Sequence, residues 1–267
     1  MSAVGIGVQK FSGGRVIERT VGTVKRNFKD FSLLALILLG LPSLLLQWVN
    51  LSFGGDANLV LARGGVMFLG GILTGVCSLL AYAAIIRGAV ADLNGRRTPV
   101  PELLSGAVQS ILPLLAVAIC WFIAIVIGMG LLIVPGLILI TMWAVLIPVQ
   151  VVEKPAGLGA FARSSALTRG NRWAIFGLGL LYFVFLMIVS GALTGVLVAS
   201  IGPSFIASRF GAPSAAFGPQ LYLGLAFSAA VSSLLSMVGA VFGAALYFEL
   251  RAAKEGLAPR DLASVFE

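Results

Sequence analysis

The chain contains no histidine, few charged residues and only two cysteines. Asp, Glu, Lys and Arg make up 10% of its 267 residues, whereas soluble domains carry about 25%. The absence of histidine removes the side chain that most often acts as a general base or a metal ligand. Cys77 and Cys120 both lie inside apolar runs, so we expect structural thiols and no disulfide or metal site. These absences disfavour an ordinary soluble domain and a histidine-dependent enzyme.

The sequence also lacks the residue patterns of common catalytic sites. It shows no metal-ligand spacing of His, Cys, Asp or Glu and no GxxxxGK[ST] phosphate loop. No paired carboxylates lie deep in an apolar run, and Ser164 and Ser165 have no evident base. We therefore expect a protein that is not an enzyme and that holds no cofactor and no metal.

Long uncharged runs take the place of these motifs. Residues 103–152 contain no Asp, Glu, Lys or Arg, which is too long for one membrane span of about 20 residues and sufficient for two. Val134-Pro135-Gly136 lies near the middle of this run, where proline and glycine favour a turn. The run therefore predicts a membrane hairpin with spans at about 111–134 and 135–152.

Four further apolar runs predict, with this hairpin, an all-α bundle of six transmembrane helices. They cover about 31–49, 64–86, 173–200 and 220–248. Pro42 is expected to kink the first span, and Gly71 and Gly75 give the second a GxxxG pair that allows close helix packing. The expected domains are a leader at 1–30, a membrane domain at 31–248 and a tail at 249–267.

The leader has the periodicity of an amphipathic helix between residues 15 and 29. Such a helix is expected to lie in the membrane interface with its basic face toward anionic headgroups. The apolar positions are Val16, Ile17, Val21, Val24 and Phe28, and the charged positions are Arg15, Glu18, Arg19, Lys25, Arg26 and Lys29.

A weak internal repeat follows each of the three returning spans. An acidic residue, a Gly turn and a short amphipathic helix occur at about 91–104, 152–164 and 254–264. With the leader helix placed before the first span, the chain reads as three copies of an interfacial helix and a hairpin.

The distribution of basic residues predicts the orientation. Only two of the 18 Lys and Arg residues, Arg63 and Arg209, fall in loops one, three and five of a six-span chain. Because cytoplasmic loops carry the excess of Lys and Arg, we expect both termini in the cytoplasm and anionic lipids of the inner leaflet as partners. The net charge of +8 does not indicate nucleic acid, since the charges cluster at the ends of apolar runs.

Two groups of polar residues are candidate sites. The first is an interfacial ring that would bind a lipid phosphate or a protein partner, or would instead consist of ion pairs that tie the hairpins together: Arg87, Asp92, Glu153, Arg172, Glu249 and Arg251. The second is one face of the sixth span, which would line a cavity or would serve helix packing: Ser228, Ser232 and Ser236.

Three segments carry a resemblance to a known family. They are WAVLIPVQVVE at 143–153, FARSSALTRGNRW at 161–173 and LRAAKEGL at 250–257. Over roughly the last two-thirds of its length the chain resembles the membrane domain attached to some bacterial glycerophosphodiester phosphodiesterases and related stand-alone, uncharacterised inner-membrane proteins. The resemblance implies a six-helix domain in a bacterial plasma membrane. It does not imply phosphodiesterase activity, which belongs to a separate soluble barrel.

Two function hypotheses follow. The preferred one is a non-catalytic scaffold or accessory protein that sits among lipids and binds another membrane or envelope protein. The alternative is a transporter or lipid-handling permease for an uncharged or amphiphilic solute, with a cavity near Ser228, Ser232 and Ser236. The short fourth span, with Pro135 and Pro148, favours this alternative.

Overall fold

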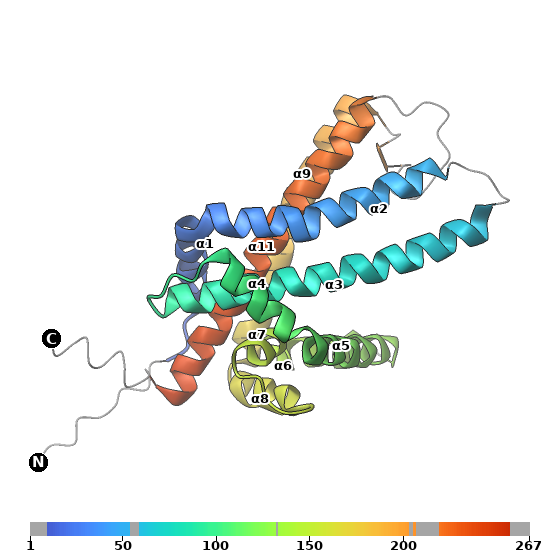
Figure 1. The fold of residues 1–267 in the computed structure, drawn as a ribbon. Coiled ribbons are helices and arrows are strands. Elements are labelled where there is room, and N and C mark those ends of the chain that lie inside the picture. The colour runs from blue at the N-terminus through green and yellow to red at the C-terminus, as the bar shows by residue number, and fades with distance from the viewer. Residues whose placement is uncertain (1–9, 54–58, 132, 203–204, 207–218, 257–267) are drawn as a thin grey trace, which may run out of the picture. The chain divides into compact units, whose positions relative to one another are not determined.

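The computed structural model describes residues 10–53, 59–131, 133–202, 205–206 and 219–256, and all regular elements within them are helical (Figure 1). The elements are α1 (Gly13–Ala35), the π-helix η1 (Leu36–Gly40), α2 (Leu41–Ser52), α3 (Val60–Leu93), α4 (Val100–Gln109), α5 (Ile111–Leu131), α6 (Ile133–Met142), α7 (Leu146–Val152), α8 (Gly159–Thr168), α9 (Arg172–Ile201) and α11 (Pro219–Glu255).

Six stretches of helix in the described chain are long and apolar enough to cross a membrane. They begin at Gly13, Val60, Ile111, Val134, Arg172 and Pro219. The predicted all-α fold with six spans is therefore confirmed, and the chain is an integral membrane protein. Helix α11 runs across the expected domain boundary after residue 248, and α1 runs across the one after residue 30 with a kink at Asn27.

The first span is irregular one turn before Pro42. Residues Leu36–Gly40 form a π-helical turn in which the Leu41 N–H bonds to the Leu36 carbonyl, five residues back. Because Pro42 has no N–H and its ring crowds the carbonyl four residues earlier, a regular α-helix cannot continue here. The predicted irregularity is confirmed, and it takes the form of a π-turn.

The turn of the central hairpin lies earlier than the sequence predicted. Helix α5 ends at Leu131 and α6 begins at Ile133, so Val134 and Pro135 belong to the first turn of α6. Proline is favoured there because its missing N–H would have no partner in the helix. The prediction of a turn at Val134-Pro135-Gly136 is therefore wrong by a few residues.

Gly136 has a packing role. A Cβ atom at this position would lie 2.3 Å from Met129 Sδ and 3.1 Å from the Met129 backbone nitrogen. Gly136 thus allows the backbones of α5 and α6 to approach closely, which is a common use of small residues between membrane helices.

The fourth span is interrupted. Helix α6 ends at Met142, a turn covers residues 143–145, and α7 resumes at Leu146. The short helices expected before spans three and five are present as α4 and α8, each of 10 residues. The third copy of the short helix, beyond residue 256, lies outside the described residues.

The described chain divides into two compact units. Unit 1 contains residues up to Asn27, Ala83–Gly179 and the chain from Gly239 on, and unit 2 contains Phe28–Tyr82 and Leu180–Val238. The break at Asn27 coincides with a non-helical backbone conformation inside α1. Unit 2 has its own buried cluster, which consists of Leu51, Leu197, Phe205, Leu221 and Leu225.

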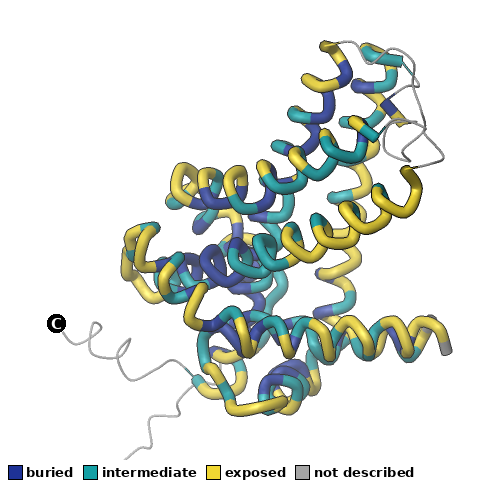
Figure 2. The backbone as a smooth tube through the Cα atoms, turned by 45° about the vertical axis from the view of Figure 1, so that its right-hand side comes forward, coloured by how far each residue is buried: buried dark blue, intermediate teal, exposed yellow. Residues whose placement is uncertain are grey.

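Many residues along the spans are exposed (Figure 2), and a large share of them are apolar. Leu61 and Phe68 on α3 are 91% and 69% exposed, and Ile188 on α9 is 66% exposed. Apolar patches of this kind are unusual on soluble proteins. In a bilayer they would contact hydrocarbon chains, where exposed apolar side chains have no free-energy penalty.

The glycine at the α5–α6 contact gives a stability prediction. Replacing Gly136 with Leu should lower the melting temperature in detergent, because the new side chain would collide with Met129, a destabilisation of about 1–3 kcal/mol. Gly130→Leu is the matched control, since a Cβ at Gly130 meets no atom within 4 Å. Equal melting temperatures for the two variants would show that the close approach of α5 and α6 is not needed.

Candidate functional site

Glu249 lies at the centre of the polar interactions in unit 1. Its side chain on α11 is only 1% exposed, and it is held by two arginines from α1. Arg15 Nε donates a hydrogen bond to Glu249 Oε1 at 2.7 Å, and Arg19 Nη1 lies 3.0 Å from Oε2. The Arg19 guanidinium also lies 4.7 Å from the centre of the Phe248 ring, a cation–π contact.

A second ion pair joins α1 to α3. Arg26 Nη2 lies 2.6 Å from Asp92 Oδ2, and the Asp92 side chain is 6% exposed. With Arg15 and Arg19, this makes three arginines of the leader that face carboxylates of the protein. These three members of the basic face pair with carboxylates of the protein, and the contact of that face with lipid headgroups stays a prediction. An unpaired charge in a buried position has a large free-energy cost, so the buried carboxylates of Glu249 and Asp92 are paired with arginines.

Glu153 joins the end of α7 to α8 and α11. Its carboxylate accepts two hydrogen bonds from Arg163, from Nε at 2.6 Å and from Nη2 at 3.0 Å. The Tyr247 hydroxyl donates a third hydrogen bond, at 2.7 Å. Arg163 pairs in addition with Glu255, which Arg251 contacts at 3.0 Å. Two carboxylates and two arginines thus alternate where three helices meet.

These contacts set the protonation of Glu153. Burial alone would raise the pKa of this carboxyl, but the hydrogen bonds from Arg163 and Tyr247 and the charges of Arg163 and Arg251 hold the pKa below its usual range. The same pair raises the pKa of Arg163. Both groups are therefore charged at neutral pH.

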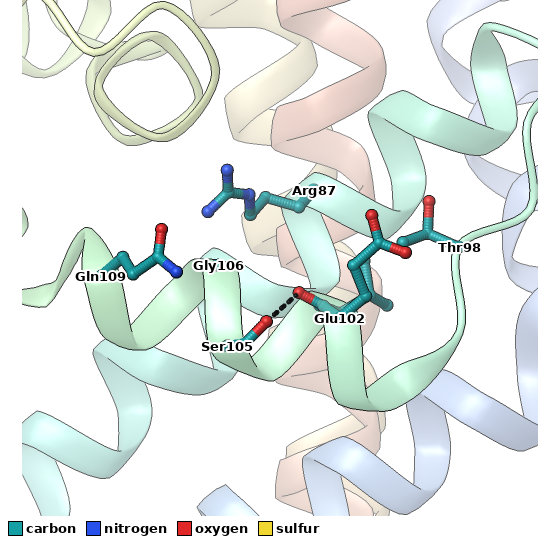
Figure 3. Close-up of a pocket in the computed structure, with 7 residues that line it drawn as sticks. Arg87, Thr98, Glu102, Ser105, Gly106 and Gln109 are labelled. Atoms are coloured by element: carbon teal, nitrogen blue, oxygen red, sulfur yellow. Dashed lines mark hydrogen bonds between the residues drawn. The ribbon is translucent and has the colours of Figure 1, made fainter.

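Arg87 has a different environment. Its Nη1 donates to Ser110 Oγ at 3.4 Å, and no carboxylate of the described residues forms an ion pair with it. The guanidinium lies across α4 at Gly106 and lines a cavity of about 330 Å³ (Figure 3). The other lining residues are Thr98, Glu102, Leu103, Ser105, Gly106 and Gln109.

All six residues of the predicted ring fall within unit 1, but they do not form one open ring. Asp92, Glu153, Glu249 and Arg251 are occupied by internal partners, as described above. Arg172 has its Nε buried without a hydrogen-bond partner in the described part of the chain. Most of the set therefore ties helices together, and Arg87 is the member that lines a cavity.

Several partners in these contacts are not evident from the sequence: Arg15, Arg19, Arg26, Arg163, Tyr247 and Glu255. The periodicity of the leader shows only which residues share a helix face, so it predicts a lipid-facing surface for its arginines. Their spacing at positions 15, 19 and 26 matches one helix face. That spacing was the available signal, but it does not tell which neighbour the face contacts.

The serines of the sixth span bond mainly to their own helix. Ser228 Oγ donates to the Leu225 carbonyl at 2.9 Å, and Ser236 Oγ donates to the Ser232 carbonyl at 2.9 Å. Ser228 is fully buried and Ser232 is exposed. None of the three lines the cavity at Arg87. Their role in a solute cavity stays a prediction.

A model of a protein family described as a domain of unknown function (DUF7847) matches residues 31–250. This match covers most of the chain, which therefore belongs to that family. No curated protein and no solved structure matches the chain. Asp92 and Glu249 lie within the matched residues, whereas their partners Arg15, Arg19 and Arg26 precede them.

The buried carboxylate gives the first prediction for this site. Glu249→Gln should lower the melting temperature, because Arg15 and Arg19 would lose the charge that holds α1 on α11, at a cost of about 1–3 kcal/mol. Glu18→Gln, an exposed position on the same helix α1, should leave it unchanged. If the two variants melt alike, the ion pairs to Glu249 contribute nothing to stability.

A second prediction concerns the stability of the protein at acidic pH. Because the folded-state pKa of Glu153 is lowered from 4.5, its contribution to stability is present above that value and is lost as the pH falls through the folded-state pKa. Melting curves from pH 7 to pH 3 should show wild type more stable than Glu153→Gln at pH 7, with the gap closing below about pH 4.5. A gap that stays constant over this range would contradict the assignment.

Proposed function

We propose that this member of the DUF7847 family is a non-catalytic protein of the bacterial plasma membrane with a scaffold or accessory role. The observation that carries the proposal is the use of the ionisable residues in unit 1. Asp92, Glu153 and Glu249 are all paired with arginines from other helices. Ionisable groups of membrane proteins that serve transport or catalysis have to change partner or protonation. The three carboxylates of this protein are instead held in ion pairs within the protein.

The distribution of charge supports an orientation with both termini in the cytoplasm. Among the described residues, every Lys and Arg except Lys29 and Arg63 belongs to unit 1. Lys and Arg accumulate on the cytoplasmic side of membrane proteins, so unit 1 is the part that faces cytoplasmic partners. Arg96, Arg97 and Arg169 are exposed there and are available to another protein or to anionic headgroups.

The first helix supports an interfacial position for the leader. Ile17 and Val21 are 41% and 47% exposed, one turn apart on the same face, while Val16 and Thr20 are buried. An exposed apolar stripe beside exposed basic residues such as Lys25 suits the boundary between headgroups and acyl chains. The resemblance of 143–173 to the membrane domain of certain phosphodiesterases agrees with an accessory role.

One observation favours a transporter as the second candidate. The fourth span is broken between α6 and α7, and Gln150 on α7 is 2% exposed with its Oε1 lacking a hydrogen-bond partner among the described residues. Interrupted helices and unpaired polar groups at membrane depth are features of solute sites in transporters. In a transporter Gln150 would contact the solute, whereas a scaffold has no such requirement.

Photo-crosslinking in native membranes tests the scaffold proposal. A crosslinking amino acid placed at Arg96 or Arg169, both exposed in unit 1, should give the same discrete protein adduct. At Phe122, which is 63% exposed on apolar α5, it should give none. Gln150→Leu should leave the adduct unchanged.

Two results would contradict the proposal. Full-length protein with no discrete adduct at either unit 1 position would remove the partner on which a scaffold depends. Loss of the adduct in Gln150→Leu, in protein that melts like wild type, would connect the function to the broken fourth span and favour the transporter.

A further inference from the structure

Unit 1 contains three related contacts between a returning helix and a short helix. Helix α11 meets α1 through Glu249, Arg15 and Arg19. Helix α7 meets α8 through Glu153 and Arg163. Helix α3 meets α4 through Arg87, which reaches only the Ser110 hydroxyl. The first two contacts pair an acid of the returning helix with an arginine. At the third, the acid of α3, Asp92, pairs with Arg26 of α1, and Arg87 has no ion pair with α4 among the described residues.

At the third contact, the Arg87 guanidinium lies directly against the backbone of α4. A Cβ atom at Gly106 would lie 2.5 Å from Arg87 Nη1 and 2.8 Å from Cζ, so Gly106 leaves room for the guanidinium in this position. Arg87 lies over the middle of α4, beside Gly106 (Figure 3), and lines the cavity. The N–H donors of a guanidinium form a planar fork that suits a phosphate group.

The cavity also contains one negative charge. Glu102, in the first turn of α4, lines the same cavity as Arg87, and the two do not form an ion pair in the described structure. Gln109 lies on one side of Arg87, and Thr98 and Glu102 lie on the other (Figure 3). A simple anion would be repelled by Glu102 and a simple amine by Arg87. A molecule with a phosphate and an ammonium satisfies both.

The surroundings of the cavity indicate where such a molecule comes from. Beyond Gln109, a strip of apolar side chains continues from the end of α4 along α5. Their exposed fractions are 56% for Val108, 76% for Leu112, 50% for Ile119, 63% for Phe122 and 51% for Ile123. The opposite face of the same two helices is buried through Leu103, Ala107, Leu114 and Val117. The acyl chains of a lipid would bury apolar surface along this strip, whereas a polar metabolite has no apolar part that would contact it.

We propose that the cavity between α3 and α4 binds the headgroup of a phospholipid that carries a primary amine. The phosphate lies on Arg87 over Gly106, the ammonium lies at Glu102, and the acyl chains run along the exposed face of α5. Gln109 and Thr98 supply further polar groups at the two ends. This site does not depend on the scaffold role, since a transporter would hold a structural lipid in the same way.

Native mass spectrometry of the full chain in detergent tests the site. Delipidated protein is mixed with phosphatidylethanolamine, phosphatidylglycerol or soluble phosphoethanolamine. Wild type should retain phosphatidylethanolamine in preference to the other two. Arg87→Gln should weaken retention of this lipid about tenfold, which corresponds to about 1.4 kcal/mol. Arg97→Gln changes an exposed arginine of the loop between α3 and α4 that does not line the cavity, and it should retain the lipid like wild type.

Two further variants separate binding from folding. Arg87→Lys keeps the charge and the fold but loses the planar fork, so it should also weaken retention. Glu102→Gln is an exposed change, and it should abolish the preference for phosphatidylethanolamine over phosphatidylglycerol. The melting temperature of each variant shows whether it is folded.

Several outcomes would overturn the proposal. Equal retention by Arg87→Gln and wild type, or equal losses in Arg87→Gln and Arg97→Gln, would show that lipid does not bind at Arg87. Equal retention of the two lipids by wild type would remove the role of Glu102. Equal binding of soluble phosphoethanolamine would show that α5 does not hold acyl chains.

Discussion

Glu249 places a negative charge where almost no water reaches, and the packing of unit 1 depends on satisfying it. The side chain is 1% exposed, and an unpaired carboxylate in such a position would cost several kcal/mol. Arg15 and Arg19 supply the opposite charge from the far end of the chain, so the leader is folded against α11 by an electrostatic requirement. The described residues up to Asn27 belong to the same compact unit as the part of α11 from Gly239 on.

The same requirement recurs at the ends of the other hairpins. Asp92 is paired with Arg26, and Glu153 is paired with Arg163 and Tyr247. Each acid lies at the end of a span, beside buried residues. Solvent screening is weak there, so a paired charge is favoured over an isolated one. The ends of the returning spans consequently also carry charge pairs. The Arg26–Asp92 pair and the Tyr247–Glu153 hydrogen bond link helices that are distant in sequence, whereas Glu153 and Arg163 join the consecutive helices α7 and α8.

Arg87 departs from this pattern, and the departure has a structural cause. Gly106 leaves room for the guanidinium on α4, while Glu102, the nearest acid of that helix, stands apart on the other side of the cavity. Asp92, Glu153 and Glu249 are neutralised by arginines of the protein, whereas Arg87 faces a cavity, and under our proposal a lipid of the surrounding membrane supplies its partner. Lipid and protein thus complete the same kind of contact.

The sequence by itself determined the membrane class, the six spans and the short helices α4 and α8, because these follow from the length and polarity of continuous segments. It also located Asp92, Glu153 and Glu249 as the acids of interest. Only the tertiary structure decided which arginine meets which acid, that α5 ends at Leu131 and α6 begins at Ile133, and that Gly136 and Gly106 allow close approach. Periodicity records which residues share a face of one helix. The identity of the neighbouring face depends on helices brought together from opposite ends of the chain.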